Sequence, residues 1–463
     1  MSRSMRALLA VALMGMAVSQ AHASLWLDNG VPVVSNDKTE LDIYGRGQMI
    51  GVAENVPDPK ADHNRVYLFM KEARLGFKGR VDELFKYDLE FAYGGEDSNG
   101  SNTDLGLLNF VADVPIKQLG ENTVFKIGQF RVPYSREGLT DEGYMDFGDR
   151  SIANLAQYQG RDYGIALMDT RGSWTGTVGT FSSGGRDVPQ RYLPERIGIP
   201  EVVARFGYND GVDNDIYHVM GTDRNLTRTT KAFMLNGLYT LDTRIGHSTA
   251  LNLRTTDKNL LLDPNFNQFI NRGDGNVVCS ALSCERGTYW AVGGDAVIRH
   301  PLGNGQAVEG EAEANWSGYQ NRFGVVHIAS ARAQGDYQTG PWELGVRYGL
   351  LSMDSKAGYV STSATASGAT AGSPIKQTVN AKLGVPIHEI TPGITYHVRG
   401  HNMKVVADLP VYLNCPLWID STDGAYAMPD PTSTGQDTVL ATAGNNTVRR
   451  TVTEARMMFQ FQF

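Results

Sequence analysis

The chain has 463 residues, of which 42 are basic and 50 acidic, giving a formal net charge of −8 at pH 7. This balance argues against nucleic acid as a partner, because no surplus of lysine and arginine exists to neutralise phosphates. The mean hydropathy of −0.28 excludes a bundle of membrane-spanning helices.

The first 23 residues have the pattern of a secretory signal peptide. Arg3 and Arg6 precede an apolar stretch over 7–18, and Ala-His-Ala at 21–23 fits a cleavage site, so cleavage is expected after Ala23. The apolar stretch is too short for a membrane-spanning helix, which needs about 20 residues. The mature chain would carry 40 basic and 50 acidic residues.

The mature chain shows no Pro- or Ser-rich linker that would divide it into domains. A large barrel accounts for this length as one domain, because its interior can hold water. We expect residues 24–38 to form a periplasmic N-terminal segment and residues 39–463 to form the barrel.

Segments of alternating polar and apolar residues recur along the mature chain and indicate strands. They include 86–93, 201–209, 308–319 and 342–350, and the last covers 451–463. In that last segment Phe459, Phe461 and Phe463 share one face, whereas Glu454, Arg456, Gln460 and Gln462 share the other. Lipid outside and water inside fit such a strand, which is typical of a transmembrane barrel wall.

Tight and long connections alternate between these segments, as periplasmic turns and extracellular loops do in outer-membrane barrels. The sequence therefore predicts an all-β fold, a transmembrane antiparallel β-barrel of sixteen strands, with eighteen left open. The ambiguity lies in 210–230, where residues 216–220 could form a strand. The Asp-rich start of that region fits an Asp/Gly turn better than a calcium-binding loop.

The connection over 134–158 is the strongest candidate for a functional segment, because long ordered loops usually have a function. Residues 151–156 within it could form a short helix. If the connection folds inward, its carboxylates would face arginines of the wall and create a transverse field that screens solutes. A solvated outer loop is the alternative. The charged candidates for this constriction are Arg136, Glu137, Asp141, Glu142, Asp146, Asp149 and Arg150.

The alternation along the strands places both acidic and basic residues on the inward-facing side of the wall. Their electric fields would partly cancel. The basic candidates for pore lining are Arg74, Lys78, Lys126, Arg205 and Arg347, and the acidic ones are Glu309, Glu311 and Glu313.

The three cysteines are Cys279, Cys284 and Cys415. The first two flank Ser-Ala-Leu-Ser in a Gly- and Asn-rich stretch, where a loop disulfide is expected in an oxidising compartment. Motifs of hydrolases, nucleotide-binding enzymes and haem proteins are absent from the sequence, and its histidines are scattered. We therefore expect no enzyme, no cofactor and no metal site.

Four stretches resemble one family. Ala73–Gly79 with Tyr87–Phe91 is similar to the early hairpin of the phosphate-selective porin O/P family, and Phe125–Ser135 to the segment leading into its constriction loop. Glu343–Leu351 is similar to a late strand, and residues 394–396 with 403–406 are a weaker match to the penultimate hairpin. The resemblance implies a barrel of about sixteen strands, a homotrimer, and conduction of small solutes across the outer membrane of a Gram-negative bacterium.

The expected function is passive diffusion of small hydrophilic solutes or ions with at most weak selectivity. The candidate loop carries five acids and two bases. This excess of acids argues against the strong anion selectivity that the family name implies. Phosphate or anion selectivity therefore stays an alternative. A second alternative is a sleeve for a multihaem cytochrome, and a third is a surface adhesin acting through 256–286 and 414–447.

Overall fold

The computed structural model describes residues 30–56, 63–93, 105–155, 157, 159–182, 201–213, 216–217, 226–240, 278–280, 288–321, 324–353, 359–362, 375–378, 385–419 and 446–463. The expected signal peptide lies outside the described residues. Within them, no helix combines the length and the apolar character needed to cross a membrane.

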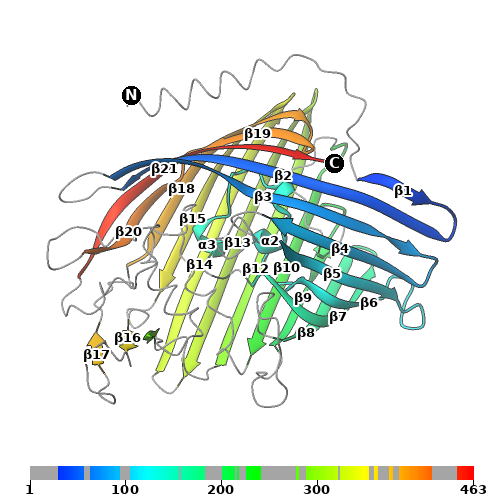
Figure 1. Cartoon of the computed structure of the whole chain (residues 1–463), viewed down its shortest axis with the longest axis horizontal. Coiled ribbons are helices and arrows are strands. Elements are labelled where there is room, and N and C mark those ends of the chain that lie inside the picture. The colour runs from blue at the N-terminus through cyan, green and yellow to red at the C-terminus, as the bar shows by residue number, and fades with distance from the viewer. Residues whose placement is uncertain are drawn as a thin grey trace.

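A closed antiparallel β-barrel is the main feature of the described chain (Figure 1). The strands of the wall pair in chain order, with β10 next to β12 and β15 next to β18, and β2 pairs with β21 to close the ring. Within the described ranges the wall has sixteen strand positions, which confirms the predicted fold. They are filled by β2 (Thr39–Val56), β3 (His63–Val81), β4 (Phe85–Tyr93), β5 (Gly106–Pro115), β6 (Val124–Arg131), β7 (Arg161–Arg171), β8 (Trp174–Phe181), β9 (Glu201–Asn209), β10 (Thr230–Thr240), β12 (Thr288–Gly303), β13 (Gln306–Asn321), β14 (Gly324–Thr339), β15 (Trp342–Met353), β18 (Ile387–Arg399), β19 (Met403–Asp408) with β20 (Val411–Ile419), and β21 (Asn446–Gln462).

The strands β19 and β20 are two halves of one wall position, since both pair with β18 and with β21. Pro410 lies between them and cannot donate a ladder hydrogen bond. The carbonyl of Pro410 still accepts from the Glu454 N–H at 3.0 Å, and the Leu409 N–H donates to the Pro392 carbonyl at 3.0 Å. The wall therefore stays continuous across the break.

Among the described residues, four short strands lie outside the sixteen wall positions. The strand β1 (Val31–Ser35) pairs with the start of β2, beyond the point where β21 ends. A separate small sheet consists of β11 (Val278–Ser280), β16 (Tyr359–Thr362) and β17 (Ile375–Thr378). Cys279 lies in β11 but Cys284 lies outside the described residues, so the expected disulfide stays a prediction. Cys415 is buried in β20.

The two faces of the wall differ in polarity, because side chains alternate along each strand. In β9, Arg205 is buried within the barrel, whereas Val202 and Phe206 are exposed on the outside. In β21, Gln460 is buried, whereas Phe459 and Phe461 are exposed. This arrangement places polar groups inside and apolar groups outside, as a barrel wall in lipid requires.

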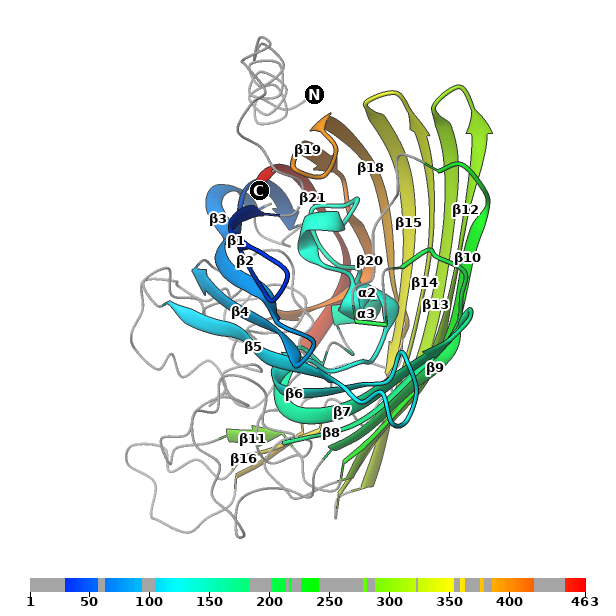
Figure 2. The ribbon, with the colours of Figure 1, turned by 90° about the vertical axis from the view of Figure 1, so that its right-hand side faces the viewer.

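The connections differ between the two ends of the barrel. At the turn end, most connections are short, such as 82–84, 172–173 and 340–341, and both β1 and the end of β21 lie there. The opposite end, the loop end, carries most of the long connections. The connection 210–229 is the exception, because it is long yet lies at the turn end. The helices α2 (Arg136–Leu139) and α3 (Ile152–Leu155) lie inside the ring of strands (Figure 2).

Candidate functional site

The connection between β6 and β7, residues 132–160, folds into the lumen. We call it the constriction loop. It contains α2, the single 3-10 turn η1 (Glu142–Tyr144) and α3. Polar caps divide it into short pieces: the Ser135 hydroxyl accepts from the Gly138 N–H at 3.1 Å, and Asp141 accepts from the Gly143 N–H at 2.8 Å.

Glu142 is the centre of a buried ionic network that ties this loop to the wall. Its carboxylate accepts from Arg74 Nη1 at 3.1 Å and from Arg150 Nη2 at 2.7 Å, and Arg131 also donates to it. Arg46 lies 3.5 Å away and binds the neighbouring Asp141 directly. The loop acids therefore contact the wall arginines directly.

The arginines determine the ionisation of these two carboxyl groups. Burial alone would raise the pKa of Asp141, but the charges of Arg46, Arg131 and Arg74 outweigh it and hold the pKa below the usual value. Burial also opposes ionisation of Glu142, yet the surrounding guanidinium groups hold its pKa well below the ordinary range. Both groups are consequently carboxylates at neutral pH.

Arg136 ties α2 to the opposite wall. Its Nη1 and Nη2 atoms donate to the two carboxylate oxygens of Asp213 at 2.9 and 2.8 Å, and its Nε donates to Glu311 at 3.1 Å. Such a bidentate pair fixes the orientation of the guanidinium as well as its position. Asp213 belongs to the connection between β9 and β10, so two inward segments from opposite ends of the barrel meet here.

Glu137 links α2 to α3 and to the late strands. Its carboxylate accepts from the Ser151 N–H at 2.9 Å and lies 3.3 Å from Arg347 Nη1. Its own N–H donates to Glu313 at 3.1 Å. Arg347 also donates to Glu389, from Nη2 at 2.7 Å. Three predicted residues, Glu137, Glu313 and Arg347, are thus brought together.

The segment from Met145 to Asp149 is held by the neighbouring wall. Lys71 Nζ donates to the Gly148 carbonyl at 2.6 Å and lies 3.4 Å from Asp149. Lys404 Nζ donates to the Met145 carbonyl. Burial and the charge of Glu343 raise the pKa of Asp146 well above its usual value.

Asp146 belongs to a cluster of three buried carboxyl groups, with Asp336 and Glu343, whose oxygens lie within 4.8 Å of one another. Gln334 bridges Asp146 and Asp336, donating at 3.0 and 2.8 Å. Glu343 accepts from His397 Nε2 at 2.8 Å. The expectation of no metal site stays a prediction.

The other predicted lining residues point inward but have partners on the wall. Arg205 Nη1 lies 2.6 Å from Asp295, and Arg299 Nε lies 2.7 Å from Glu309. Lys126 Nζ lies 2.6 Å from Asp113. Lys78 Nζ lies 5.4 Å from the centre of the Tyr44 ring. Arg205, Glu309, Lys126 and Lys78 thus each interact with a neighbouring residue of the wall.

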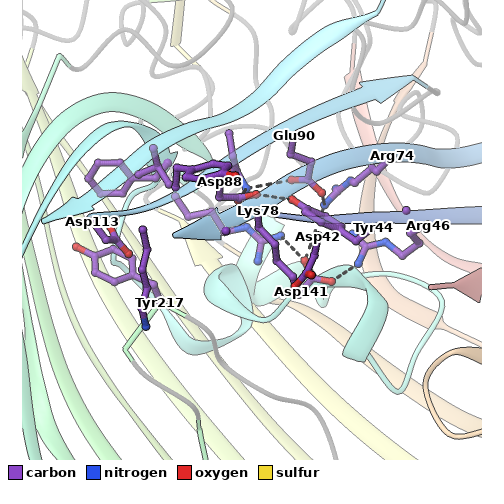
Figure 3. Close-up of a pocket in the computed structure, with 18 of the residues that line it drawn as sticks. Asp42, Tyr44, Arg46, Arg74, Lys78, Asp88, Glu90, Asp113, Asp141 and Tyr217 are labelled. Atoms are coloured by element: carbon purple, nitrogen blue, oxygen red, sulfur yellow. Dashed lines mark hydrogen bonds and ion pairs between the residues drawn. The ribbon is translucent and has the colours of Figure 1, made fainter. Parts of the chain in front are cut away.

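A cavity of about 540 Å³ remains between the constriction loop and the inner faces of β2–β7. In Figure 3, Arg46, Arg74 and Asp141 lie at one end of it and Asp113 and Tyr217 at the other. Its charged lining consists of eight bases and six acids: Arg46, Arg74, Lys78, Arg80, Lys86, Lys126, Arg131 and Arg161, with Glu40, Asp42, Asp88, Glu90, Asp113 and Asp141.

Sequence analysis missed several residues of this site. Lys71 has outward parity, but a β-bulge where Gln48 opposes Glu72 and Met49 opposes Met70 turns it inward. A lysine that faces lipid is energetically costly. A lysine at an outward position was therefore the sequence signal that the alternation breaks here. Asp213 and Tyr217 lie in the ambiguous stretch 210–230, where alternation gives no information.

The family model described as phosphate-selective porin O and P matches residues 46–208. The predicted family resemblance is confirmed. The matched part of the chain runs from β2 to β9, so it includes the whole constriction loop, part of β2 and the whole of β3–β7.

None of the curated proteins compared with the chain matches it. Among solved structures, OmpT, an outer membrane protein of Vibrio cholerae, is 8% identical over 93% of this chain and 99% of its own, with a TM-score of 0.49. The outer membrane channel DcaP of Acinetobacter baumannii is 11% identical over 95% and 100%, with a TM-score of 0.47. Salmonella typhi OmpF is 13% identical over 94% and 100%, with a TM-score of 0.45.

Proposed function

We propose that this chain is an outer-membrane porin of a Gram-negative bacterium that passes small hydrophilic solutes and ions by passive diffusion. The observation that carries the proposal is the polar cavity between the constriction loop and β2–β7. A wall that is apolar outside and charged inside suits a water-filled passage through lipid. The family match over the same strands supports this function.

We further propose that ion selectivity is weak, because most charges around the cavity are paired. Arg46 and Arg74 contact Glu72 and Glu142, and Arg161 lies 3.6 Å from Glu90. Lys78, Lys86, Asp42 and Asp88 line the cavity and form no salt bridge among the described residues. Two lysines against two aspartates favour neither anions nor cations. The acids of the loop add little to a preference for cations, since their partners are arginines.

The proposed assembly is a homotrimer in the outer membrane, as the family resemblance implies. A cytochrome sleeve has less support, because the constriction loop already occupies the lumen through buried ionic contacts that a partner would have to displace. The adhesin alternative depends on 256–286 and 414–447, which lie mostly outside the described residues.

Planar-bilayer recording of the purified protein tests the channel. We expect discrete ohmic steps in KCl, a small reversal potential in a KCl gradient, and no block by submillimolar phosphate. The protein-free detergent extract is the control. Absence of any conductance would contradict the porin proposal, and strong anion selectivity with phosphate block would favour the phosphate-selective alternative.

A further inference from the structure

The connection between β9 and β10 enters the lumen from the turn end, where most other connections are short. Asn209 starts it, because its side-chain oxygen accepts from the N–H groups of Gly211 and Val212 at 3.1 and 3.0 Å. Gly211 has a φ of +101°, which suits glycine. The chain then turns inward, so that Val212, Asp213 and Tyr217 are buried.

Contacts with both the wall and the constriction loop fix this inward position. Asp213 makes the bidentate pair with Arg136, and the Val212 carbonyl accepts from Arg299 Nη1 at 3.0 Å. The hydroxyl of Tyr217 lies 2.9 Å from that of Thr177 on β8. These contacts hold the described part of the segment against both the wall and the constriction loop.

The ring of Tyr217 forms part of the cavity surface, opposite the end that carries Asp141 (Figure 3). It packs edge-on against Phe130, with the ring centres 5.7 Å apart. Lys126 Nζ lies 5.0 Å from the centre of the Tyr217 ring, in the range of a cation–π contact. The same ammonium group lies 2.6 Å from Asp113. Tyr217 thus provides bulk at the rim and, beside Asp113 and the ring of Phe130, a further site of attraction for the ammonium group.

We propose that Tyr217 is a selectivity-determining residue of the passage, where its ring limits solute size and keeps the Lys126 ammonium group in the path of permeating anions. The proposal rests on the channel function proposed above and adds a second rim to the constriction. The first rim is Asp141 with Tyr144, carried in from the loop end. The second is Tyr217, carried in from the turn end.

Three substitutions separate bulk from ring electrostatics. Tyr217→Ala removes the bulk, and we expect higher single-channel conductance and faster entry of larger uncharged sugars into proteoliposomes. Tyr217→Phe keeps the ring, and we expect the selectivity of the wild type. Tyr217→Leu keeps a bulky apolar group without the aromatic face, and we expect the chloride-to-potassium permeability ratio to fall roughly two-fold, as loss of a weak cation–π contact allows.

A double-mutant cycle with Lys126→Met identifies the mechanism. In the Lys126→Met background, Tyr217→Leu and Tyr217→Phe should have equal reversal potentials, because the ammonium group is gone. Tyr239→Leu, on the exposed outer face of β10, is the matched control and should conduct as the wild type does.

Two results would overturn the proposal. One is a Tyr217→Ala channel with wild-type conductance and sugar flux, and the other is equal reversal potentials for Tyr217→Leu and Tyr217→Phe when Lys126 is present. Heat-modifiable migration shows whether Tyr217→Ala folds. If it does not fold, the reversal potentials of Tyr217→Leu and Tyr217→Phe still test the proposal. A wild-type protein without conductance would count against the porin proposal instead.

Discussion

Two regions of the lumen carry similar charges but use them differently. In the tethered region, where the constriction loop contacts the wall, carboxylates and guanidinium groups contact each other and are buried, as for Arg136 with Glu311 and Arg74 with Glu142. In the open region, along β2–β7, charged groups border a cavity and some, such as Lys78, lack a salt bridge among the described residues. Charge on a barrel wall reaches a solute only where the chain itself leaves it uncovered.

Removal of the Glu142 charge should have the largest effect. Glu142→Gln leaves buried arginines, including Arg74 and Arg150, with a weaker partner, which costs about 3–5 kcal/mol for a broken buried pair. We expect the constriction loop to loosen, the conductance to rise and fluctuate, and anion preference to increase. Single-channel recording and heat-modifiable migration measure both consequences.

The control for this change is Glu121→Gln, at an exposed turn. It should leave conductance and stability as in the wild type. A Glu142→Gln channel that matches this control would show that the network does not hold the loop.

A charge reversal in the open region should have an intermediate effect. Lys78→Glu changes the charge beside the cavity without breaking a salt bridge among the described residues, so we expect selectivity to move several-fold towards cations in 0.1 M KCl. In 1 M KCl the shift should shrink, because the Debye length falls from about 10 to about 3 Å. Reversal potentials at the two ionic strengths measure it.

For comparison, Lys38→Glu reverses an exposed charge in the segment between β1 and β2. It should move the reversal potential much less. Equal shifts for Lys38→Glu and Lys78→Glu would mean that overall charge, and not the open region, sets the selectivity.

The pH dependence of the tethered region should be the smallest effect. Since burial and Glu343 raise the pKa of Asp146, its protonated form stabilises the folded loop. That stabilisation is fully present below the ordinary carboxyl pKa and is lost as pH rises through the raised value. Asp146→Asn mimics the protonated form, so at pH 8 we expect it to be more stable than the wild type by on the order of 1 kcal/mol.

At pH 4.5 the two proteins should unfold at nearly the same temperature. Asp141 and Glu142 act in the opposite sense, because their lowered pKa values stabilise the fold above the ordinary carboxyl pKa, and this is lost as pH falls. Thermal midpoints between pH 4.5 and 8 measure the difference, with the exposed Asp37→Asn as control. A constant gap between Asp146→Asn and wild type would contradict a raised pKa.

The barrel itself could be predicted from sequence, because the alternation of side chains is a local property of each strand. Arg205 faces inward and Phe206 outward for that reason alone. The constriction loop was found from its length and its position after β6. Its charged residues were identified, but the pairing of Glu142 with four arginines could not be, since those arginines come from different strands and from the loop itself.

Features that break the alternation of side chains could not be predicted from the sequence. The bulge at Lys71 shifts parity by one residue, and Pro410 divides one wall strand into β19 and β20. The inward course of 210–213 depends on the Asn209 turn and on the bidentate pair between Asp213 and Arg136. These are contacts made in three dimensions, and no period in the sequence encodes them.

The closure of the wall between β2 and β21 has a consequence for folding. Gln48 and Gln460 share a hydrogen bond although they are 412 residues apart in sequence. Contacts this distant form late and slowly, because the entropy of closing the intervening chain must be overcome first. Until they form, β2 and β21 each present a bare edge that could pair with another chain. The order of assembly, and not only the final stability, must therefore protect the two closing strands.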